Sequence, residues 1–316
     1  MTADFNRKKL RFKSINGRTS KVSSGQLMHP SGYGEGAERF ADSLPDILAV
    51  HGLRDLATAI LTSRRIDAAR IFMYGGHVIK CGLGPLLSSW TGNGRISALA
   101  TNGAGTIHDL EMALFGATSE DVEAGIADGS FGMWKETGEL WARGVEIAFS
   151  RGTGLGAGLG MLILEEGGDP AVSPLAAACD AGTPITVHPA LGGDIVHPHP
   201  DLDWGKLGTV CERDFDLLGS RIAELSRGVI INAGSAVVMP EVFLKLLTCA
   251  RNLGHDVRDI TAAGFDMMRP YRSLNNVLGR PVRALGGRSI EINGSHEVML
   301  PLLDIFIDAE ERRDRK

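Results

Sequence analysis

The chain has 316 residues, of which 43% are hydrophobic and 22% are charged, so it can bury a full core and does not belong to the disordered class. Its formal net charge of -5 argues against a general nucleic-acid binder, which needs a concentrated positive surface. No apolar run reaches the roughly 18 residues of a membrane span, and the basic N-terminus lacks the apolar core of a signal peptide. We therefore expect a globular protein that binds neither nucleic acid nor membrane.

The cysteines indicate the cellular compartment, and the lack of a linker indicates the domain organisation. The four cysteines form no CxxC pair and no secretory spacing, and reduced thiols are the default in the cytoplasm, where we expect this protein. No Ser/Pro-rich linker divides the chain, so we expect an N-terminal arm over residues 1–40 and a single α/β domain over residues 41–316. The basic run RKKLRFK at 7–13 favours a solvated arm or a contact with a neighbouring subunit over a polyanion site.

Helical and strand-like patterns alternate along the chain. Residues 43–69 predict a helix that leads into a short strand ending at 74, and residues 84–94 predict a helix with a glycine stop. A strand, a glycine turn and a helix follow over residues 95–116. This order predicts a Rossmann-like parallel sheet with helices on both faces, in which ligands bind beyond the carboxyl ends of the strands. Further pairs of a helix and a strand are expected at 173–190, 214–236 and 240–266.

Glycine-bearing turns at the ends of the predicted strands are the most informative feature. Glycine lets the backbone approach a phosphate, and a following helix offers free amides and a positive dipole end. Any parallel sheet also needs glycine where a strand turns into a helix, but five such turns on one edge would form a groove of dinucleotide size. RGTGLGAGLG (151–160) follows a helical pattern instead, so we expect it to pack helices together. The five turns are MYGGHVIKCG (73–82), ATNGAG (100–105), HPALGGD (188–194), INAGSA (231–236) and TAAGFD (261–266).

Taken in order, these turns resemble those of deoxyhypusine synthase, from about residue 71 to residue 303. TNGAGTIHDL (101–110) is similar to the family's TTAGG turn and acidic helix, TPITVHPALGGD (183–194) to its PVFSPALTDG segment, and TAAGFD to its TAQEFDG. The resemblance implies an NAD-binding Rossmann-like fold and a homotetramer that shares its active sites across subunits. It also implies transfer of an aminobutyl group from spermidine through an imine on a lysine.

Several positions depart from that family. The stretch that corresponds to its reactive WGK motif, residues 269–282, contains no lysine, and the WGK at 204–206 falls much earlier in the chain. An imine cannot form without a primary amine. A family glutamate aligns with His108, and a family aspartate aligns with Ser295 or His296, so carboxylates that would hold a polycation are replaced. We therefore do not expect a strict deoxyhypusine synthase.

The same resemblance suggests which residues would contact NAD. They lie in the turns after the predicted strands and at the start of the helices that follow. The expected cofactor residues are Gly75, Gly76, Asn102, Gly103, Gly105, Asp109, Gly234, Ser235 and Asp266.

Residues 186–201, TVHPALGGDIVHPHPD, combine three histidines with two aspartates. We expect His188, Asp194 and His197 to face a substrate as general acid and base, together with His108 and with Lys80 as a phosphate ligand or amine nucleophile. Two other roles stay open for this loop. Proline would keep HPHP extended and point alternate histidines the same way, so a zinc or iron site is one, and a purely structural loop is the other. The metal alternative would use His188, His197 and His199.

These residues predict an NAD-dependent enzyme that oxidises a small amine or amino-acid-like substrate by hydride transfer and then performs transfer or hydrolysis at the imine. Two alternatives remain open at this point. One is a metal-dependent hydrolase that uses the histidine loop, and the other is a non-catalytic, ligand-binding oligomer.

Overall fold

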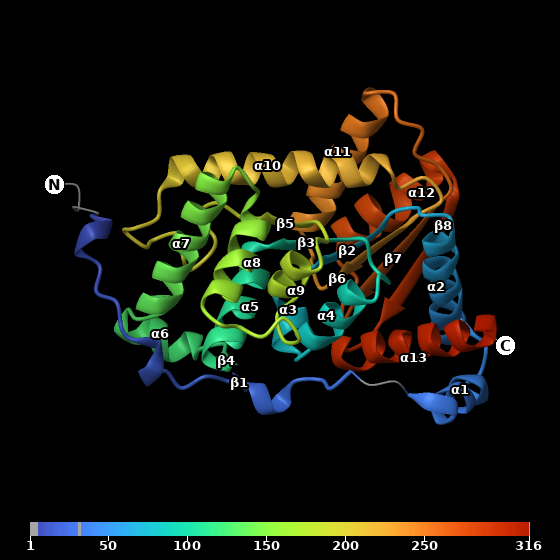
Figure 1. The fold of residues 1–316 in the computed structure, drawn as a ribbon, viewed down its shortest axis with the longest axis horizontal. Helices are drawn as coiled ribbons and strands as arrows, with labels where there is room; N and C mark the ends of the chain where they lie inside the picture. Colours follow the sequence, from blue (N-terminus) through green and yellow to red (C-terminus); the bar gives the residue numbers. More distant parts are fainter. Residues whose placement is uncertain (1–5, 31–32, 316) are drawn as a thin grey trace.

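A six-stranded parallel sheet lies at the centre of the computed structural model, which describes residues 6–30 and 33–315 (Figure 1). Its strands are β2 (Arg70–Tyr74), β3 (Ala98–Asn102), β5 (Ile185–His188), β6 (Val229–Ala233), β7 (Ile260–Asp266) and β8 (Gly287–Asn293). They pair in parallel in the order β5-β3-β2-β6-β7-β8. The chain thus moves outward from β2 to one edge, returns to β6 beside β2, and moves outward again. This doubly wound order confirms the predicted α/β Rossmann-like fold, and its switch point lies between β2 and β6.

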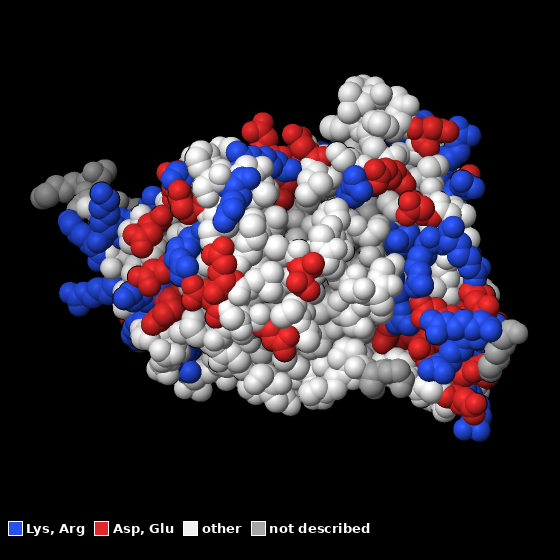
Figure 2. Space-filling model, in the orientation of Figure 1, with Lys and Arg blue, Asp and Glu red and all other residues white. Residues whose placement is uncertain are grey.

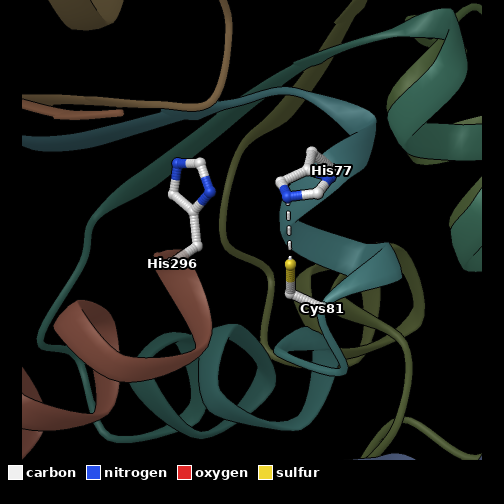
Figure 3. A group of neighbouring side chains, drawn as sticks. All are labelled: His77, Cys81 and His296. Atoms are coloured by element: carbon white, nitrogen blue, oxygen red, sulfur yellow. Dashed lines mark hydrogen bonds between the residues drawn. The ribbon is translucent and has the colours of Figure 1, made fainter. Parts of the chain in front are cut away.

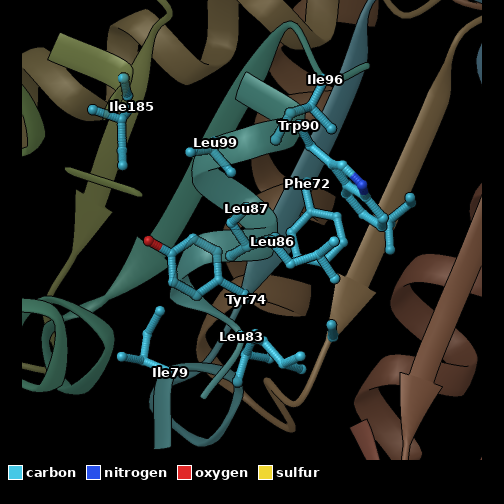
Figure 4. Close-up of a cluster of buried hydrophobic side chains, with 14 of the residues drawn as sticks. Phe72, Tyr74, Ile79, Leu83, Leu86, Leu87, Trp90, Ile96, Leu99 and Ile185 are labelled. Atoms are coloured by element: carbon cyan, nitrogen blue, oxygen red, sulfur yellow. The ribbon is translucent and has the colours of Figure 1, made fainter. Parts of the chain in front are cut away.

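Helices cover both faces of the sheet, because successive strand residues point to opposite sides. In β2, Ile71 and Met73 lie on one face and Phe72 and Tyr74 on the other, and all four are fully buried. Figure 4 shows Phe72 and Tyr74 in a cluster with Trp90. The helices of this second face include α2 (Leu48–Arg65), α4 (Gly84–Gly92) and α13 (His296–Arg315). The first face is covered by α10 (Trp204–Ala223), α11 (Val238–Asn252) and the π-helix η4 (Ser273–Gly279), which leads into α12 (Arg280–Leu285).

The connection from β3 to β5 is long, and it contains the glycine-rich motif at 151–160. Most of this motif forms a helix whose glycines allow close contact with neighbouring segments. A Cβ at Gly158 would lie 2.6 Å from the carbonyl oxygen of Gly144, and one at Gly156 would lie 2.2 Å from that of Ile185. The predicted packing role is therefore confirmed. The helices of this connection are α5 (Gly103–Phe115), α6 (Val122–Asp128), α7 (Lys135–Arg151), α8 (Leu155–Glu165) and α9 (Pro174–Asp180).

The N-terminal segment packs along its own chain. Arg7 Nη1 donates to the carbonyl oxygen of His197, and Lys13 pairs with Asp128 at 2.8 Å. The basic run therefore contacts α6 and the histidine loop, while Lys8, Lys9, Arg11 and Lys13 stay exposed, as expected of a solvated arm. Parts of the predicted arm, residues 1–5 and 31–32, lie outside the described residues. The described elements here are η1 (Arg7–Lys9), η2 (Ile15–Gly17), β1 (Val22–Ser23), which pairs with β4 (Ala117–Thr118), η3 (Ser24–Gln26) and α1 (Gly34–Ser43).

Two local predictions were wrong. Residues 261–266 form the end of strand β7 and not a glycine turn, and a Cβ at Gly264 would lie 3.2 Å from Leu278, so this glycine has a packing role. Residues 76–80, expected as part of a turn, form the short helix α3 (Gly76–Lys80). Both differences arise because glycine also serves close packing and tight helix entry, which its presence in a sequence does not distinguish.

The surface shows mixed charge and a sparsely charged centre. On the face in Figure 2, Lys and Arg are interspersed with Asp and Glu toward the two ends of the molecule, and the middle of that face carries few charges. Within the described part of the chain, no single helix is long and apolar enough to cross a membrane. The helices α7 and α8 meet that length and composition only as a pair, with a bend of 115° between them.

Candidate functional site

The glycine turns after β2, β3 and β6 and the loop after β5 lie at one edge of the sheet, because all six strands run in the same direction. At the switch point, the turns after β2 and β6 touch each other. The Gly75 amide donates to the carbonyl oxygen of Ala233 at 3.0 Å, and a Cβ at Gly75 would lie 2.3 Å from that of Gly234. Gly234 itself has a φ of 64°, which favours glycine. The turns after β2 and β6 therefore contact each other through backbone atoms, which leaves no room for a side chain at Gly75.

Several of the predicted cofactor residues cap the start of a helix or end a strand. The Asn102 side chain accepts from the Gly105 amide and caps α5, and Ser235 Oγ accepts from the Met239 amide at 3.2 Å. Asp266 ends β7 and accepts from the Met268 amide. These residues lie at the carboxyl edge, where a cofactor would bind.

Asp109 has a different environment from the other predicted cofactor residues. Its side chain is almost fully buried, and it accepts from the Leu175 amide at the start of α9 at 2.9 Å. Burial raises the pKa of Asp109 to about 7. One Asp109 oxygen therefore holds the start of α9, and the other, Oδ1, is buried without a hydrogen-bond partner among the residues that the structure describes.

A cavity of about 220 Å³ opens beside this edge, and it brings together three of the predicted catalytic residues. Lys80 comes from the end of α3, His108 from α5, and Asp194 from the loop after β5. The ring of His108 also touches the first glycine turn, since a Cβ at Gly76 would lie 3.0 Å from its Cδ2. The lining also includes the apolar residues Ile107, Phe131 and Ile195 and the charged residues Arg18, Glu111 and Glu120.

A hydrogen-bonded chain fixes the protonation of His108. Thr118 Oγ1 donates to Glu111 Oε2 at 2.6 Å and lies 2.8 Å from His108 Nδ1. Because the hydroxyl proton is already directed at the carboxylate, His108 Nδ1 must donate to Thr118, and Nε2 is left as an acceptor. Burial lowers the pKa of His108 to about 4, so the ring is neutral at pH 7. His108 can therefore accept a hydrogen bond from a substrate in the cavity.

Glu111 and Arg18 form a buried ion pair that sequence reasoning missed. Both Glu111 oxygens accept from the Arg18 guanidinium at 2.8 Å, and Thr137 Oγ1 donates to the same carboxylate at 2.8 Å. The two charged side chains are 3% and 1% exposed, so the pair is shielded from water. Only a three-dimensional structure could join them, because 93 positions separate them in the chain.

Glu120 is a second carboxylate that the sequence did not indicate. It is buried, and it accepts from the Gly132 amide at 3.1 Å. Burial raises the pKa of Glu120, although this hydrogen bond opposes the shift. Its position after β4 gives the cavity an acidic group opposite the loop that carries Asp194.

Asp194 has the environment of a proton-exchanging group. Its carboxyl lies over the first residue of α5, since a Cβ at Gly103 would be 2.1 Å from Asp194 Oδ2. That oxygen is buried and has no hydrogen-bond partner among residues 6–30 and 33–315. Burial raises the pKa of Asp194 to about 6, near the value that suits a general acid or base.

The three histidines of residues 186–201 do not converge. His188 ends β5, with Nε2 3.1 Å from Thr186 Oγ1, and burial lowers its pKa to about 4. His197 Nδ1 accepts from the Asp194 amide, and His199 Nδ1 accepts from the Asp201 amide. The predicted extended HPHP backbone was wrong, because the His197 and His199 amides each donate to a carbonyl three residues earlier and the loop turns.

Aromatic contacts hold two of these histidines in the protein interior. His197 lies against Trp204, with ring centroids 5.3 Å apart, and the His199 ring meets Phe12 edge to face at 4.8 Å. None of the three histidines lines the cavity described above, which this loop reaches through Gly193, Asp194 and Ile195. The three rings therefore share no common centre, while His197 Nε2 is buried without a hydrogen-bond partner in the described segments of the chain.

Two further features bear on the chemistry. Lys206, in the WGK sequence, lies at the start of α10 and pairs with Glu146 at 2.6 Å, away from the cavity lining.

In the part of the chain that the structure describes, one group of His, Cys, Asp and Glu side chains places three donor atoms close enough for a single metal ion, and it consists of His77, Cys81 and His296 (Figure 3). Burial, followed by the nearby Glu297 carboxylate, raises the pKa of the Cys81 thiol to about 11.

No protein-family model and no curated protein matches the chain. Among solved structures, it is similar to AgrE in a ternary complex with ornithine and NAD+, at 13% identity and a TM-score of 0.51 over 90% of this chain and 35% of that one. It is also similar to a conserved protein assigned to LOR/SDH from Methanococcus maripaludis S2, at 16% identity and a TM-score of 0.50 over 94% and 74% of the two chains. A protein assigned as a deoxyhypusine synthase from Entamoeba histolytica gives 13% identity and a TM-score of 0.47 over 75% and 74%.

This chain spans about a third of the length of AgrE. At these identities the likeness concerns the fold alone. The protein therefore has an α/β fold of the kind found in NAD-binding enzymes.

Proposed function

We propose that the protein is an NAD-dependent enzyme that oxidises a small amine or amino-acid-like substrate and then transfers or hydrolyses the resulting imine. The observation that carries this proposal is the position of the cavity. It brings Lys80, His108 and Asp194 together beside the glycine turn at the switch point, where doubly wound sheets bind dinucleotides. The likeness of the fold to AgrE, which was solved with ornithine and NAD+, supports the same reading.

The charged groups of the cavity suit a zwitterionic substrate. Asp194 and Glu120 offer carboxylates to an ammonium group, and Lys80 offers an ammonium to a carboxylate. The apolar residues Ile107 and Phe131 would contact the carbon chain of the substrate.

In the proposed reaction, Asp194 takes a proton from the substrate ammonium as the carbon-hydrogen bond breaks and the carbon-nitrogen double bond forms. NAD, when bound, supplies the acceptor for the hydride that leaves this carbon. The His108 Nε2 acceptor orients the remaining N–H of the substrate. Addition of water to the imine then releases ammonia and leaves a carbonyl product. Addition of a second amine instead, followed by loss of ammonia, leaves the carbon group on that amine.

The residues at the switch point fit a dinucleotide. Gly75, Gly76 and Gly234 keep side chains off the edge between β2 and β6, and Gly103 begins α5 directly after β3. Dinucleotide folds often use an acidic residue to bind the ribose. Here β3 ends in Asn102, whose side chain caps α5, so recognition would depend mainly on the backbone.

Extraction of the purified, full-length protein tests the cofactor. We expect nicotinamide dinucleotide to appear in the supernatant of the denatured protein, and added NAD to raise the Tm. A clean extract together with an unchanged Tm would overturn the proposal.

A further inference from the structure

His77, Cys81 and His296 form a compact group at the switch-point edge of the sheet (Figure 3). His77 lies in α3, Cys81 follows one helical turn later, and His296 is the first residue of α13. Their donor atoms all lie within 4.8 Å of one another, and His77 Nε2 is 3.3 Å from Cys81 Sγ. Because residues four apart share a helix face, α3 presents its two side chains as a chelating pair.

The protonation of His296 is set by the backbone. Its Nε2 lies 3.1 Å from the carbonyl oxygen of Phe265, and a carbonyl only accepts, so Nε2 carries the hydrogen. Nδ1 therefore keeps its lone pair. This atom is buried, in a residue that is 1% exposed, and it has no hydrogen-bond partner in the described ranges. Figure 3 shows the ring nitrogen nearest the Cβ of His296 turned toward His77.

The buried lone pair of His296 Nδ1 is expected to have a hydrogen-bond donor or a metal ion as its partner. A buried acceptor without a hydrogen-bond partner destabilises the fold, so buried polar atoms are rarely left unpaired. A histidine that donates one ring N–H to a backbone carbonyl and turns the other nitrogen to a shared centre has the arrangement typical of a metal ligand.

We propose that His77, Cys81 and His296 bind a zinc-class divalent cation. Two imidazoles and one thiolate are ligands that zinc prefers. Bonds of about 2.0–2.1 Å to nitrogen and about 2.3 Å to sulfur place tetrahedral ligand atoms roughly 3.4–3.6 Å apart. The His77 and Cys81 donor atoms already meet that spacing, and His296 needs only a small side-chain movement.

Three protein ligands leave a fourth position open to water or to the Glu297 carboxylate, which lies beside Cys81. Binding would break the S–H bond of Cys81, form a metal–sulfur bond and release one proton to the solvent. None of its three ligands lines the cavity that holds His108 and Asp194. The group adjoins the glycine turns of the proposed dinucleotide site, since His77 follows Gly76 and a Cβ at Gly234 would lie 3.1 Å from His296.

Metal titration of the full-length protein, treated with a chelator and free of added NAD, tests this site. We expect one Zn²⁺ per chain in competition with a chromophoric chelator. Co²⁺ should give a thiolate-to-cobalt charge-transfer band in the near ultraviolet. Cys81→Ser should abolish the band and weaken Zn²⁺ binding by at least about tenfold, and His296→Gln should weaken it similarly.

Cys249→Ser is the matched control, because Cys249 is an exposed cysteine outside the group, and it should leave the spectrum and the affinity unchanged. Circular dichroism checks that each variant folds. Absence of the charge-transfer band in the wild-type protein would overturn the proposal whether or not the variants fold. Zn²⁺ affinity that is the same in Cys81→Ser, His296→Gln and wild type would also overturn it.

Discussion

At the scale of single residues, Asp194 combines burial, an unpaired oxygen and a position over the start of α5. Its pKa is raised to about 6 by burial, so the folded protein holds its proton more tightly than the unfolded chain does. As pH rises through this range, ionisation of Asp194 therefore lowers the stability of the fold while it creates the base that the reaction needs. Stability and activity oppose each other at this residue.

Asp194→Asn separates the two effects. We expect turnover to fall by about 10²-fold or more, because the general base is lost. The Tm at neutral pH should not fall, because a buried charge is removed, and the rise in Tm on addition of NAD should persist. Steady-state kinetics and thermal unfolding measure these effects.

The exposed residue Asp201 in the same loop supplies the control, since Asp201→Asn should leave turnover unchanged. In the wild-type protein, kcat/KM should decline as pH falls below about 6, where Asp194 becomes protonated. Persistence of that acid limb in Asp194→Asn would assign it to another group.

Glu111 anchors the N-terminal segment to the domain. Glu111→Gln would leave the Arg18 guanidinium buried beside a neutral amide, and breaking a buried ion pair in this way destabilises a protein by about 3–5 kcal/mol. Urea unfolding measures the change in the free energy of unfolding. Asp121→Asn, which removes an exposed pair with Lys21, should leave that free energy nearly unchanged, and a comparable loss in both variants would contradict this account.

At the scale of elements, the α7 and α8 pair depends on glycine. Gly158→Ala would place a Cβ 2.5 Å from the Ala148 Cβ and 2.6 Å from the Gly144 carbonyl oxygen. We expect a destabilisation of about 1–3 kcal/mol from this overpacking, in spite of the better helix propensity of alanine. Gly208→Ala in α10 has open space around it and should instead stabilise the fold by roughly 0.5–1 kcal/mol. Equal effects of the two changes on urea unfolding would exclude the packing explanation.

Helices and strands were predictable from the sequence where the spacing of apolar residues alone determines them. Apolar strands such as β6, followed by glycine and an amphipathic helix, indicate a doubly wound sheet without any long-range information. The turn of the HPHP loop was not predictable, because it depends on hydrogen bonds within the loop and on the rings of Phe12 and Trp204. Sequence also could not join Arg18 to Glu111, since that contact exists only after the chain has folded.

Part of the candidate site was predictable from the sequence. Lys80 and Asp194 were identified because each lies in a turn or loop after a predicted strand, and a parallel sheet brings such positions together. His108 was identified because it aligns with a glutamate of the family that the turns resemble. Glu120 gave no such signal, since it follows the short strand β4, which pairs with the N-terminal segment.

At the scale of the whole molecule, we propose a homotetramer. The sparsely charged middle of the face in Figure 2 supports this, since interface cores are depleted of charged residues. Light scattering coupled to gel filtration should give four times the 33.7 kDa of one chain. A mass of 33.7 kDa that persists at high protein concentration would contradict the proposal.

The N-terminal segment gives the cavity part of its wall, through Arg18. This residue leaves the ribosome long before Glu111, and it has no counter-ion until α5 has been synthesised and folded. The wall of the proposed substrate site is therefore complete only after α5 has folded, although the segment that carries Arg18 is synthesised first. Proteolytic removal of the first 20 residues would take Arg18 from that wall and leave the Glu111 carboxylate buried without its counter-ion.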